Sequence, residues 1–249
     1  MLSLIFPRES VSRQKEGRAR KIVMTSGCFK ELAPRFLDMA SEKLGLRVGQ
    51  LLSIRNQYTQ QNVIKNSWRV REHSRELGQN PDAHKILSFS RRYDYPPVLV
   101  YKMAYPKISK GQRKILEEVE KHDAVFSQSR EEKSARDAAV FEASVVEAFR
   151  HAGVEVRTQE ELVEEQKQKY GRAVATPDLL FRRPIKVNGR EIMWVDAKNF
   201  YACDVPFIRR SLETQAAKYN KYFGAGAFMF HYGFSENYKD TKDVLYLSS

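Results

Sequence analysis

The fold of this chain is decided by the stretch Thr176-Pro177-Asp178-Leu179-Leu180-Phe181, which is followed by Val187-Asn188-Gly189-Arg190-Glu191-Ile192-Met193-Trp194-Val195-Asp196-Ala197-Lys198. Asn-Gly between two apolar runs is the strongest short-range signal for a β-hairpin, because a type I′ turn needs a positive φ at both central residues. We therefore expect Val187 to Val195 to form two antiparallel strands that are closed by a tight turn.

Three charged side chains gather at the open end of this predicted hairpin. Side chains alternate between the faces of a strand, so Asp196 and Lys198 share one face and stand about 7 Å apart. Asp178 lies at the start of the preceding apolar run, where a twisted hairpin brings it beside Asp196. Carboxylates are hard ligands that suit Mg²⁺ or Mn²⁺, and a lysine can orient water or stabilise charge on phosphoryl oxygens. The pattern predicts a site for a divalent cation and a phosphate.

These residues resemble those of known nucleases. Pro177-Asp178 followed by Asp196-Ala197-Lys198 is similar to the PD-(D/E)xK pattern. With the hairpin, Trp194 and Tyr232-Gly233-Phe234, the motif Thr176-Pro177-Asp178 resembles the TPD-motif family, which includes the codanin-interacting nuclease of animals. The resemblance covers residues 141–234 well and the amino-terminal half only loosely. It implies a restriction-endonuclease-like (PD-(D/E)xK) mixed α/β sheet flanked by helices, metal-dependent hydrolysis of phosphodiester bonds, and a codanin-like protein partner.

The resemblance also assigns roles to residues of the hairpin. Asp178 and Asp196 are expected to hold Mg²⁺ (or Mn²⁺), with the carbonyl of Ala197 as a further ligand. Lys198 is expected to position or activate the attacking water. A catalytically silent nucleic-acid-binding adaptor on the same fold is the alternative function.

Two helices outside the hairpin contribute further candidates. In PD-(D/E)xK nucleases the helix before the first aspartate often supplies a glutamate, and in the predicted helix 138–151 Glu142 matches that position as an outer metal ligand. Glu147 is the second candidate there, and the alternative is that both are ordinary solvated glutamates. Gln215 and Tyr219 lie four residues apart on a later helix and share a face. Gln-x-x-x-Tyr after Asp-x-Lys looks like the motif of RecB-type nucleases, which implies that the two residues brace the site.

The positive charge lies entirely in the first half of the chain. Residues 1–121 contain 24 lysines and arginines and 12 aspartates and glutamates, whereas residues 122–249 contain 19 of each. The asymmetry favours a basic module that binds a polyanion, which we interpret as nucleic acid and in particular DNA. A basic surface that only maintains solubility is the alternative. We expect a basic helical region over 1–120 and a nuclease-like domain over 121–249.

The basic region is expected to contain helix-turn-helix-like units. One spans residues 29–58 and turns at Gly45, and another spans 84–105 and turns at 93–97. Residues 62–77 are expected to form a further basic helical stretch that contains Trp68, whereas residues 1–30 are expected to be poorly ordered or peripheral. Many helical hairpins bind nothing, so only the charge favours nucleic acid here. The candidate phosphate contacts, in this region and on the later helix, are Arg47, Arg55, Arg91, Arg92, Lys102, Lys218 and Lys221.

Several classes of protein are disfavoured. No apolar run reaches the length of a membrane span, so we expect a soluble protein. The two cysteines, Cys28 and Cys203, lie far apart, which argues against a zinc cluster and for a reducing compartment. We expect the nucleus, with the cytoplasm as an alternative, because residues 13–21 are dense in charge. No glycine-rich phosphate loop is present, which disfavours a nucleotide enzyme.

Overall fold

The computed structural model describes residues 2–24, 27, 29–106 and 110–249. Cys28 and residues 107–109 lie outside the described residues. The chain forms two compact units. The sheet unit comprises Met1–Glu16 and Arg136–Ser249, and the helical unit comprises Gly17–Ala135. This division differs from the expected one near residue 120, and it also places the first 16 residues with the sheet.

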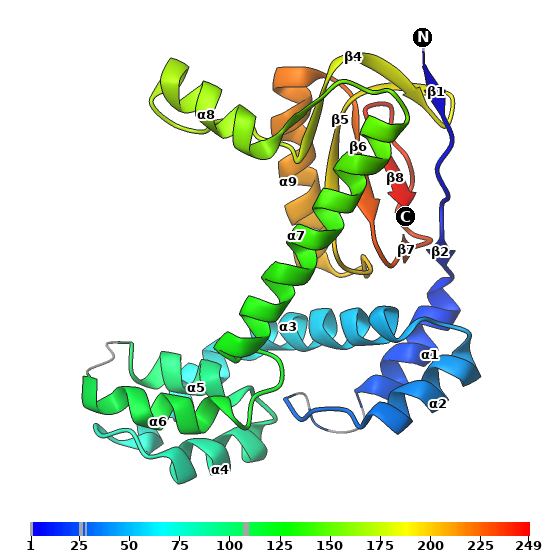
Figure 1. Cartoon of the computed structure of the whole chain (residues 1–249). Coiled ribbons are helices and arrows are strands. Elements are labelled where there is room, and N and C mark those ends of the chain that lie inside the picture. The colour runs from blue at the N-terminus through cyan, green and yellow to red at the C-terminus, as the bar shows by residue number, and fades with distance from the viewer. Residues whose placement is uncertain (1, 25–26, 28, 107–109) are drawn as a thin grey trace. The chain divides into compact units, whose positions relative to one another are not determined.

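The sheet unit is built on a mixed six-stranded sheet with the order β1-β4-β5-β6-β8, in which β3 also pairs with β4 (Figure 1). The pairs β3·β4 and β4·β5 are antiparallel, whereas β1·β4, β5·β6 and β6·β8 are parallel. Two short strands, β2 and β7, form a separate parallel pair. The strand bounds are β1 Ser3–Leu4, β2 Ser10–Val11, β3 Val156–Thr158, β4 Leu179–Val187, β5 Arg190–Lys198, β6 Gly226–Phe230, β7 Phe234–Ser235 and β8 Val244–Ser248.

The predicted Asn-Gly turn between β4 and β5 is confirmed. Asn188 has a φ of 48° and Gly189 a φ of 81°, as a type I′ turn requires. The side chain of Asn188 also accepts a hydrogen bond from the Phe6 backbone N–H at 2.9 Å and donates one to the Phe6 carbonyl at 3.1 Å. Through this contact and the β1·β4 pairing, the amino-terminal segment becomes part of the sheet unit, so the expectation that it is peripheral was wrong.

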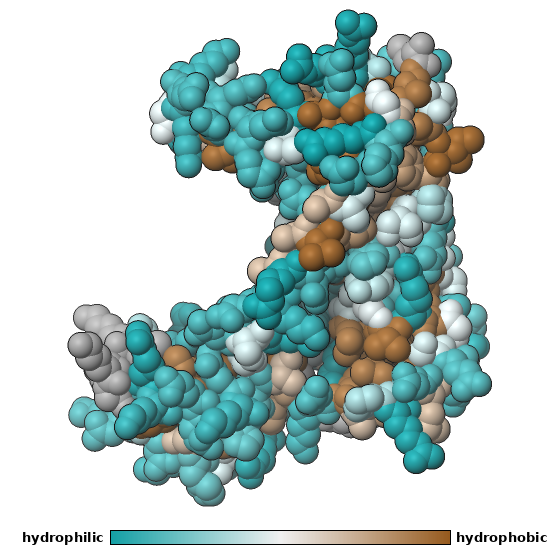
Figure 2. Space-filling view, in the orientation of Figure 1, coloured by the Kyte–Doolittle hydropathy of each residue, from teal (hydrophilic) through white to brown (hydrophobic). Residues whose placement is uncertain are grey.

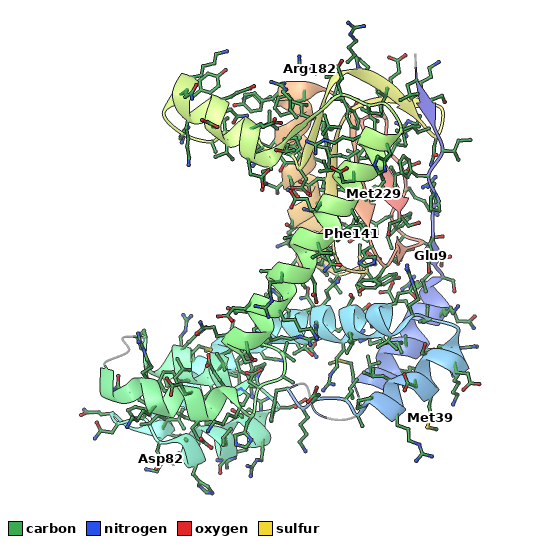
Figure 3. All side chains as sticks on the ribbon, in the orientation of Figure 1. Glu9, Met39, Asp82, Phe141, Arg182 and Met229 are labelled. Atoms are coloured by element: carbon green, nitrogen blue, oxygen red, sulfur yellow. The ribbon has the colours of Figure 1, made fainter. Side chains whose placement is uncertain are left out.

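Helices cover both faces of the sheet (Figure 1). Helix α7, Gln128–His151, packs on one face, where Phe141 and Met229 lie in the same apolar cluster (Figure 3). Helices α8, Gln159–Tyr170, and α9, Pro206–Phe223, contribute to the cluster on the other face. Successive side chains of β4 point to opposite faces of the sheet, so Leu179 belongs to the first cluster and Leu180 to the second.

The helical unit contains two helix pairs of the expected form. Gly45 has a φ of 55° and ends α2 before α3 begins, and Asp94 has a φ of 45° and ends α4 before α5 begins. Helix α3 is longer than expected, since it continues through the basic stretch around Trp68. The helices that lie wholly or partly in this unit are α1 Arg13–Val23, α2 Pro34–Leu44, α3 Val48–His73, the 3₁₀ turn η1 Ser74–Leu77, α4 Ala83–Tyr93, α5 Pro97–Ala104, α6 Lys110–Glu120 and the first residues of α7.

Hydrophilic residues cover most of the surface over α4 and α6 in the view of Figure 2. The apolar residues of these helices instead form an internal cluster with α5, which includes Ile86, Val98 and Tyr101. Among the described residues, no helix combines the length and the apolar character that a membrane span requires.

Candidate active site

The register of the hairpin brings the two predicted aspartates together. Leu179 pairs with Val195 and Leu180 with Trp194, so the same register continued outward by one residue places Asp178 opposite Asp196. The carboxylate of Asp178 accepts a hydrogen bond from the backbone N–H of Ala197, with 2.7 Å between Oδ2 and N. Asp178 is 7% exposed and Asp196 is 1% exposed. Two buried carboxyl groups therefore lie side by side at one end of the sheet.

Helix α9 holds the second aspartate in place. The amide Nε2 of Gln215 donates to Oδ2 of Asp196 at 2.9 Å and to the Tyr219 hydroxyl at 3.0 Å. The Tyr219 hydroxyl donates in turn to the carbonyl of Thr176 at 3.2 Å. The pair thus links β5 to the Thr176-Pro177-Asp178 loop, and the structure brings both residues to the position that the sequence predicted.

Lys198 lies on the same face as Asp196, as strand alternation predicts. Its ammonium forms an ion pair with Oδ1 of Asp196, and its side chain is 18% exposed. Oδ1 is buried, and among the described residues it has no partner with hydrogen-bond geometry. The Lys198 ammonium is therefore the charged partner of this oxygen among the described residues.

Burial and like charge act together on Asp178. Desolvation is the largest cause, and the charges of Asp196 and Glu142 add to it, so the pKa of Asp178 is raised to about 8. The Ala197 N–H and the Lys198 ammonium oppose the shift without offsetting it. Near neutral pH the pair consequently favours a proton on Asp178, and a cation that binds both carboxylates must displace that proton.

Glu142 approaches this pair from α7. It is half-buried, and its pKa is raised by burial first and then by the charges of Glu160 and Asp196. Within the described part of the chain, however, no three histidine, cysteine, aspartate or glutamate side chains are close enough to form a metal cluster. Glu142 is therefore near the pair without completing a three-carboxylate group. Glu147 lies elsewhere, since it is exposed and forms an ion pair with Arg150 at 3.0 Å.

The sequence analysis missed the role of α8, which holds the loop that carries Asp178. The side-chain oxygen of Gln166 accepts hydrogen bonds from the backbone N–H groups of Val174, at 2.7 Å, and Ala175, at 2.9 Å. Its amide nitrogen donates to the Ala175 carbonyl at 2.6 Å. The amide of Gln159 donates to the Thr176 carbonyl at 3.2 Å. No sequence signal distinguishes Gln166 from its charged neighbours on this helix.

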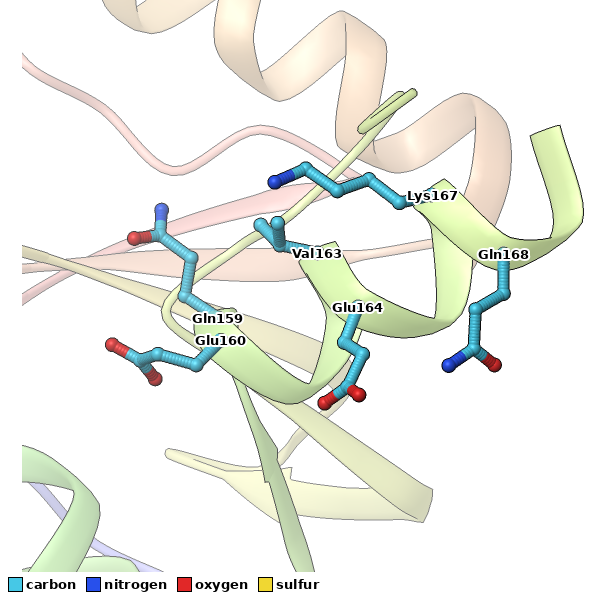
Figure 4. Close-up of a pocket in the computed structure, with 6 residues that line it drawn as sticks. All are labelled: Gln159, Glu160, Val163, Glu164, Lys167 and Gln168. Atoms are coloured by element: carbon cyan, nitrogen blue, oxygen red, sulfur yellow. The ribbon is translucent and has the colours of Figure 1, made fainter. Parts of the chain in front are cut away.

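A shallow cavity of about 370 Å³ runs along α8 (Figure 4). It begins close to the candidate site, because Gln159 contacts the loop and Glu160 raises the pKa of Glu142. Its charges are mixed, and neither aspartate of the pair lines it. The residues along it are Gln159, Glu160, Val163, Glu164, Lys167 and Gln168.

The candidate phosphate contacts differ in accessibility. Arg55 is 3% exposed, and its guanidinium donates to the backbone carbonyls of Gly27, at 2.7 Å, and Lys30. Its prediction as a nucleic-acid contact was wrong, because an arginine bound to backbone carbonyls in the interior cannot reach a phosphate. Arg92 is exposed and forms an ion pair with Glu76 at 3.5 Å. The other candidates are exposed to solvent: Arg47, Arg91, Lys102, Lys218 and Lys221.

Comparison with known proteins places these features in a family. A family model described as "Protein of unknown function TPD sequence-motif" matches residues 109–248. The chain is also similar to an uncharacterized protein, L539, of Acanthamoeba polyphaga mimivirus, with 30% identity over 216 residues that cover 79% of this chain and 75% of the viral protein. No solved structure matches the chain.

Proposed function

The chain belongs to the TPD sequence-motif family, and on that basis we propose that it is a metal-dependent nuclease of the PD-(D/E)xK type that hydrolyses phosphodiester bonds in nucleic acid, in particular DNA. The observation that carries the proposal is the buried juxtaposition of Asp178 and Asp196 beside the Lys198 ammonium. The mixed sheet flanked by helices is compatible with a restriction-endonuclease-like fold, which we propose as the finer classification.

The residues present fit a divalent cation. Two adjacent carboxylates with little exposure are unfavourable in the ionised form unless positive charge compensates them, and Lys198 supplies only one such charge. Oδ1 of Asp196 is buried, and its charged contact among the described residues is the Lys198 ammonium, so a cation bound at this oxygen would share it with Lys198. We propose that Asp178 and Asp196 hold Mg²⁺ or Mn²⁺, with the Ala197 carbonyl as a further ligand and Glu142 acting through water as an outer one.

The remaining groups of the site have positioning roles in this proposal. When bound, the cation supplies Lewis acidity and positive charge at the phosphate. Gln215 fixes the orientation of the Asp196 carboxylate, and Tyr219 holds the loop that carries Asp178 through its hydrogen bond to the Thr176 carbonyl. Lys198 orients the water whose oxygen forms the new bond to phosphorus. The phosphorus–oxygen bond to the leaving strand breaks, and that oxygen accepts a proton, which gives one phosphate monoester and one hydroxyl end.

A catalytically silent nucleic-acid-binding adaptor is the second candidate. It is favoured by the lack of a complete three-carboxylate cluster among the described residues and by the ion pair that engages Lys198. On this alternative, which includes a codanin-like protein partner, affinity for nucleic acid resides in the helical unit. That unit carries 23 lysines and arginines against 13 aspartates and glutamates.

A cleavage assay separates the two candidates. The full chain is incubated with single-stranded, duplex and branched DNA in Mg²⁺, Mn²⁺ or a chelator, and the products are resolved on a denaturing gel. Asp178→Asn, Asp196→Asn and Lys198→Ala are compared with Asp137→Asn, an exposed aspartate of α7 that serves as the matched control. The nuclease proposal expects cation-dependent products from the wild type and the control, and a loss of about 10²-fold or more in the three site variants. Equal activity in all five proteins would exclude this site.

A further inference from the structure

The exposed face of helix α3 carries a tryptophan that the core does not use. Trp68 is 67% exposed and Ile64, four residues earlier on the same face, is 49% exposed. Val70, on another side of this helix, is 2% exposed and belongs to the apolar cluster that it shares with Leu77. Large apolar side chains displayed together on a surface generally mark an interaction site. The exposure of Trp68 and Ile64 therefore makes this face a candidate interaction site.

The surroundings of Trp68 are cationic. Lys65 and Arg71 lie three residues before and three residues after it, so both flank the indole on one face of the helix. Both are exposed, and within the described part of the chain neither has an ion pair. Glu72 is the single carboxylate between residues 62 and 75, which also contain four lysines and arginines. The face thus combines an aromatic surface with positive charge on both sides.

We propose that this face, which we call the Trp68 patch (Ile64, Lys65, Trp68 and Arg71), binds single-stranded nucleic acid. An unpaired base stacks on the indole, and Lys65 and Arg71 contact the phosphates on either side of that base. In an intact duplex both faces of each base are covered by neighbouring base pairs, so the indole gains nothing there. The Trp68 patch consequently selects unpaired strands, whereas cations alone bind both forms.

The charge of the helical unit favours nucleic acid over a protein ligand. This unit carries a net charge of +10, and the remainder of the chain carries +2. Arginine is common at protein interfaces, but lysine is depleted there, so Lys65 beside Ile64 and Trp68 favours a polyanion over a protein. The inference rests on the proposed function only in taking nucleic acid as the ligand. It requires neither a metal nor catalysis.

The two tryptophans of the chain provide a direct measurement. Trp194 is fully buried, and its Nε1 donates to the Gly224 carbonyl at 2.9 Å, so an added oligonucleotide should leave its fluorescence unchanged. Trp68 is accessible, and a stacked base should quench it. The full chain is titrated in a chelator with oligo-dT of about 15 nucleotides, a site size suited to single-strand binders, and with a duplex of the same length.

The variants give distinct expected results. Trp68→Ala should abolish the quenching and weaken oligo-dT binding about tenfold while duplex affinity changes less than about twofold, because only stacking is removed. Trp68→Phe should abolish the quenching and retain most of the affinity. Lys65→Ala and Arg71→Ala should each reduce the slope of log Kd against log salt by about 0.7, the value for one lost single-strand phosphate contact. Tyr170→Ala, an exposed aromatic beside a lysine in the sheet unit, is the matched control.

Unchanged oligo-dT affinity in Trp68→Ala, with a native thermal melt, would overturn the inference and leave the patch as a surface for a protein. Equal quenching by duplex and single strand would overturn it as well. The outcome is independent of the nuclease proposal. If oligo-dT binds through Trp68 but no DNA is cleaved, the Trp68 patch is supported and the nuclease proposal is refuted. If DNA is cleaved and the Trp68 variants behave as the wild type, the nuclease proposal is supported and the Trp68 patch is refuted.

Discussion

Asp178 accepts a hydrogen bond from the backbone N–H of Ala197, with 2.7 Å between Oδ2 and N, and this bond ties the two strands together at the end of the hairpin where the carboxylates lie. It fixes the first aspartate to the residue that follows the second. The spacing of the two carboxyl groups is therefore set by the backbone of β5 rather than by flexible side chains, which is what a preorganised cation site requires.

The stability of the cation-free chain should depend on pH through Asp178. Its pKa in the folded chain, about 8, lies above that of an unfolded aspartate, so protons bind the folded state more tightly. This contribution to stability is present below about pH 4 and is lost as the pH rises towards 8. Asp178→Asn removes the titrating group. In a chelator, the wild type should become less stable relative to this variant as the pH rises from 5 to 8. Urea denaturation of both proteins at each pH measures the difference in their free energies of unfolding.

A constant difference across that pH range would show that Asp178 is ionised in the folded chain without a cation. Asp137→Asn provides the baseline, because this exposed aspartate has no comparable environment.

Stabilisation by cations should have the opposite pH dependence. A bound Mn²⁺ must displace the proton of Asp178. The affinity for Mn²⁺ should therefore increase as the pH rises towards 8, by up to about tenfold for each pH unit. The increase in Tm at a fixed Mn²⁺ concentration should therefore be small near pH 6 and larger near pH 8. Thermal melts at the two pH values, with Asp196→Asn as the comparison, test this. An increase in Tm that is independent of pH would mean that the cation binds elsewhere.

Gln166 is half-buried on α8 and should be important for the position of the loop that carries Asp178. Gln166→Ala removes three hydrogen bonds to the loop before Asp178, which we expect to cost about 1–3 kcal/mol of stability and to reduce cleavage through misplacement of the carboxylate. Gln168→Ala, a change of the same residue type two positions away on the same helix, should have little effect on either quantity. Denaturation and cleavage rates of the two variants are compared. Indistinguishable variants would show that α8 does not position the loop.

Arg55 should be a structural residue of the helical unit. Arg55→Ala leaves the carbonyls of Gly27 and Lys30 without their donor in the interior, so we expect a loss of about 2–3 kcal/mol in the free energy of unfolding. Arg35→Ala changes an exposed arginine of the same helix pair and should alter stability by less than about 0.5 kcal/mol. Urea denaturation of both variants measures the contrast. If Arg55→Ala is as stable as the wild type but binds DNA poorly, the guanidinium faces nucleic acid after all.

The sequence predicted those parts of the molecule that depend on local rules. The turn at Asn188-Gly189 follows from its backbone preferences, and alternation along β5 places Asp196 and Lys198 on one face. The spacing of four residues between Gln215 and Tyr219 places both on one face of the predicted helix, and the structure brings both to the site.

The features that sequence analysis missed depend on contacts between distant residues. The pairing of β1 with β4 joins residues about 180 positions apart, and nothing in residues 1–6 distinguishes an edge strand from a peripheral tail. The burial of Arg55 follows from its contacts with the backbone carbonyls of Gly27 and Lys30 rather than from its own helix, whose pattern is compatible with an exposed arginine.

The central claim is that Asp178 and Asp196 share one divalent cation, and calorimetric titration of the full chain with Mn²⁺ tests it most directly. We predict one site per chain in the wild type and in Asp137→Asn, no measurable binding in Asp178→Asn or Asp196→Asn, and native thermal melts for all four proteins. Identical Mn²⁺ binding by the wild type and both site variants would contradict the claim.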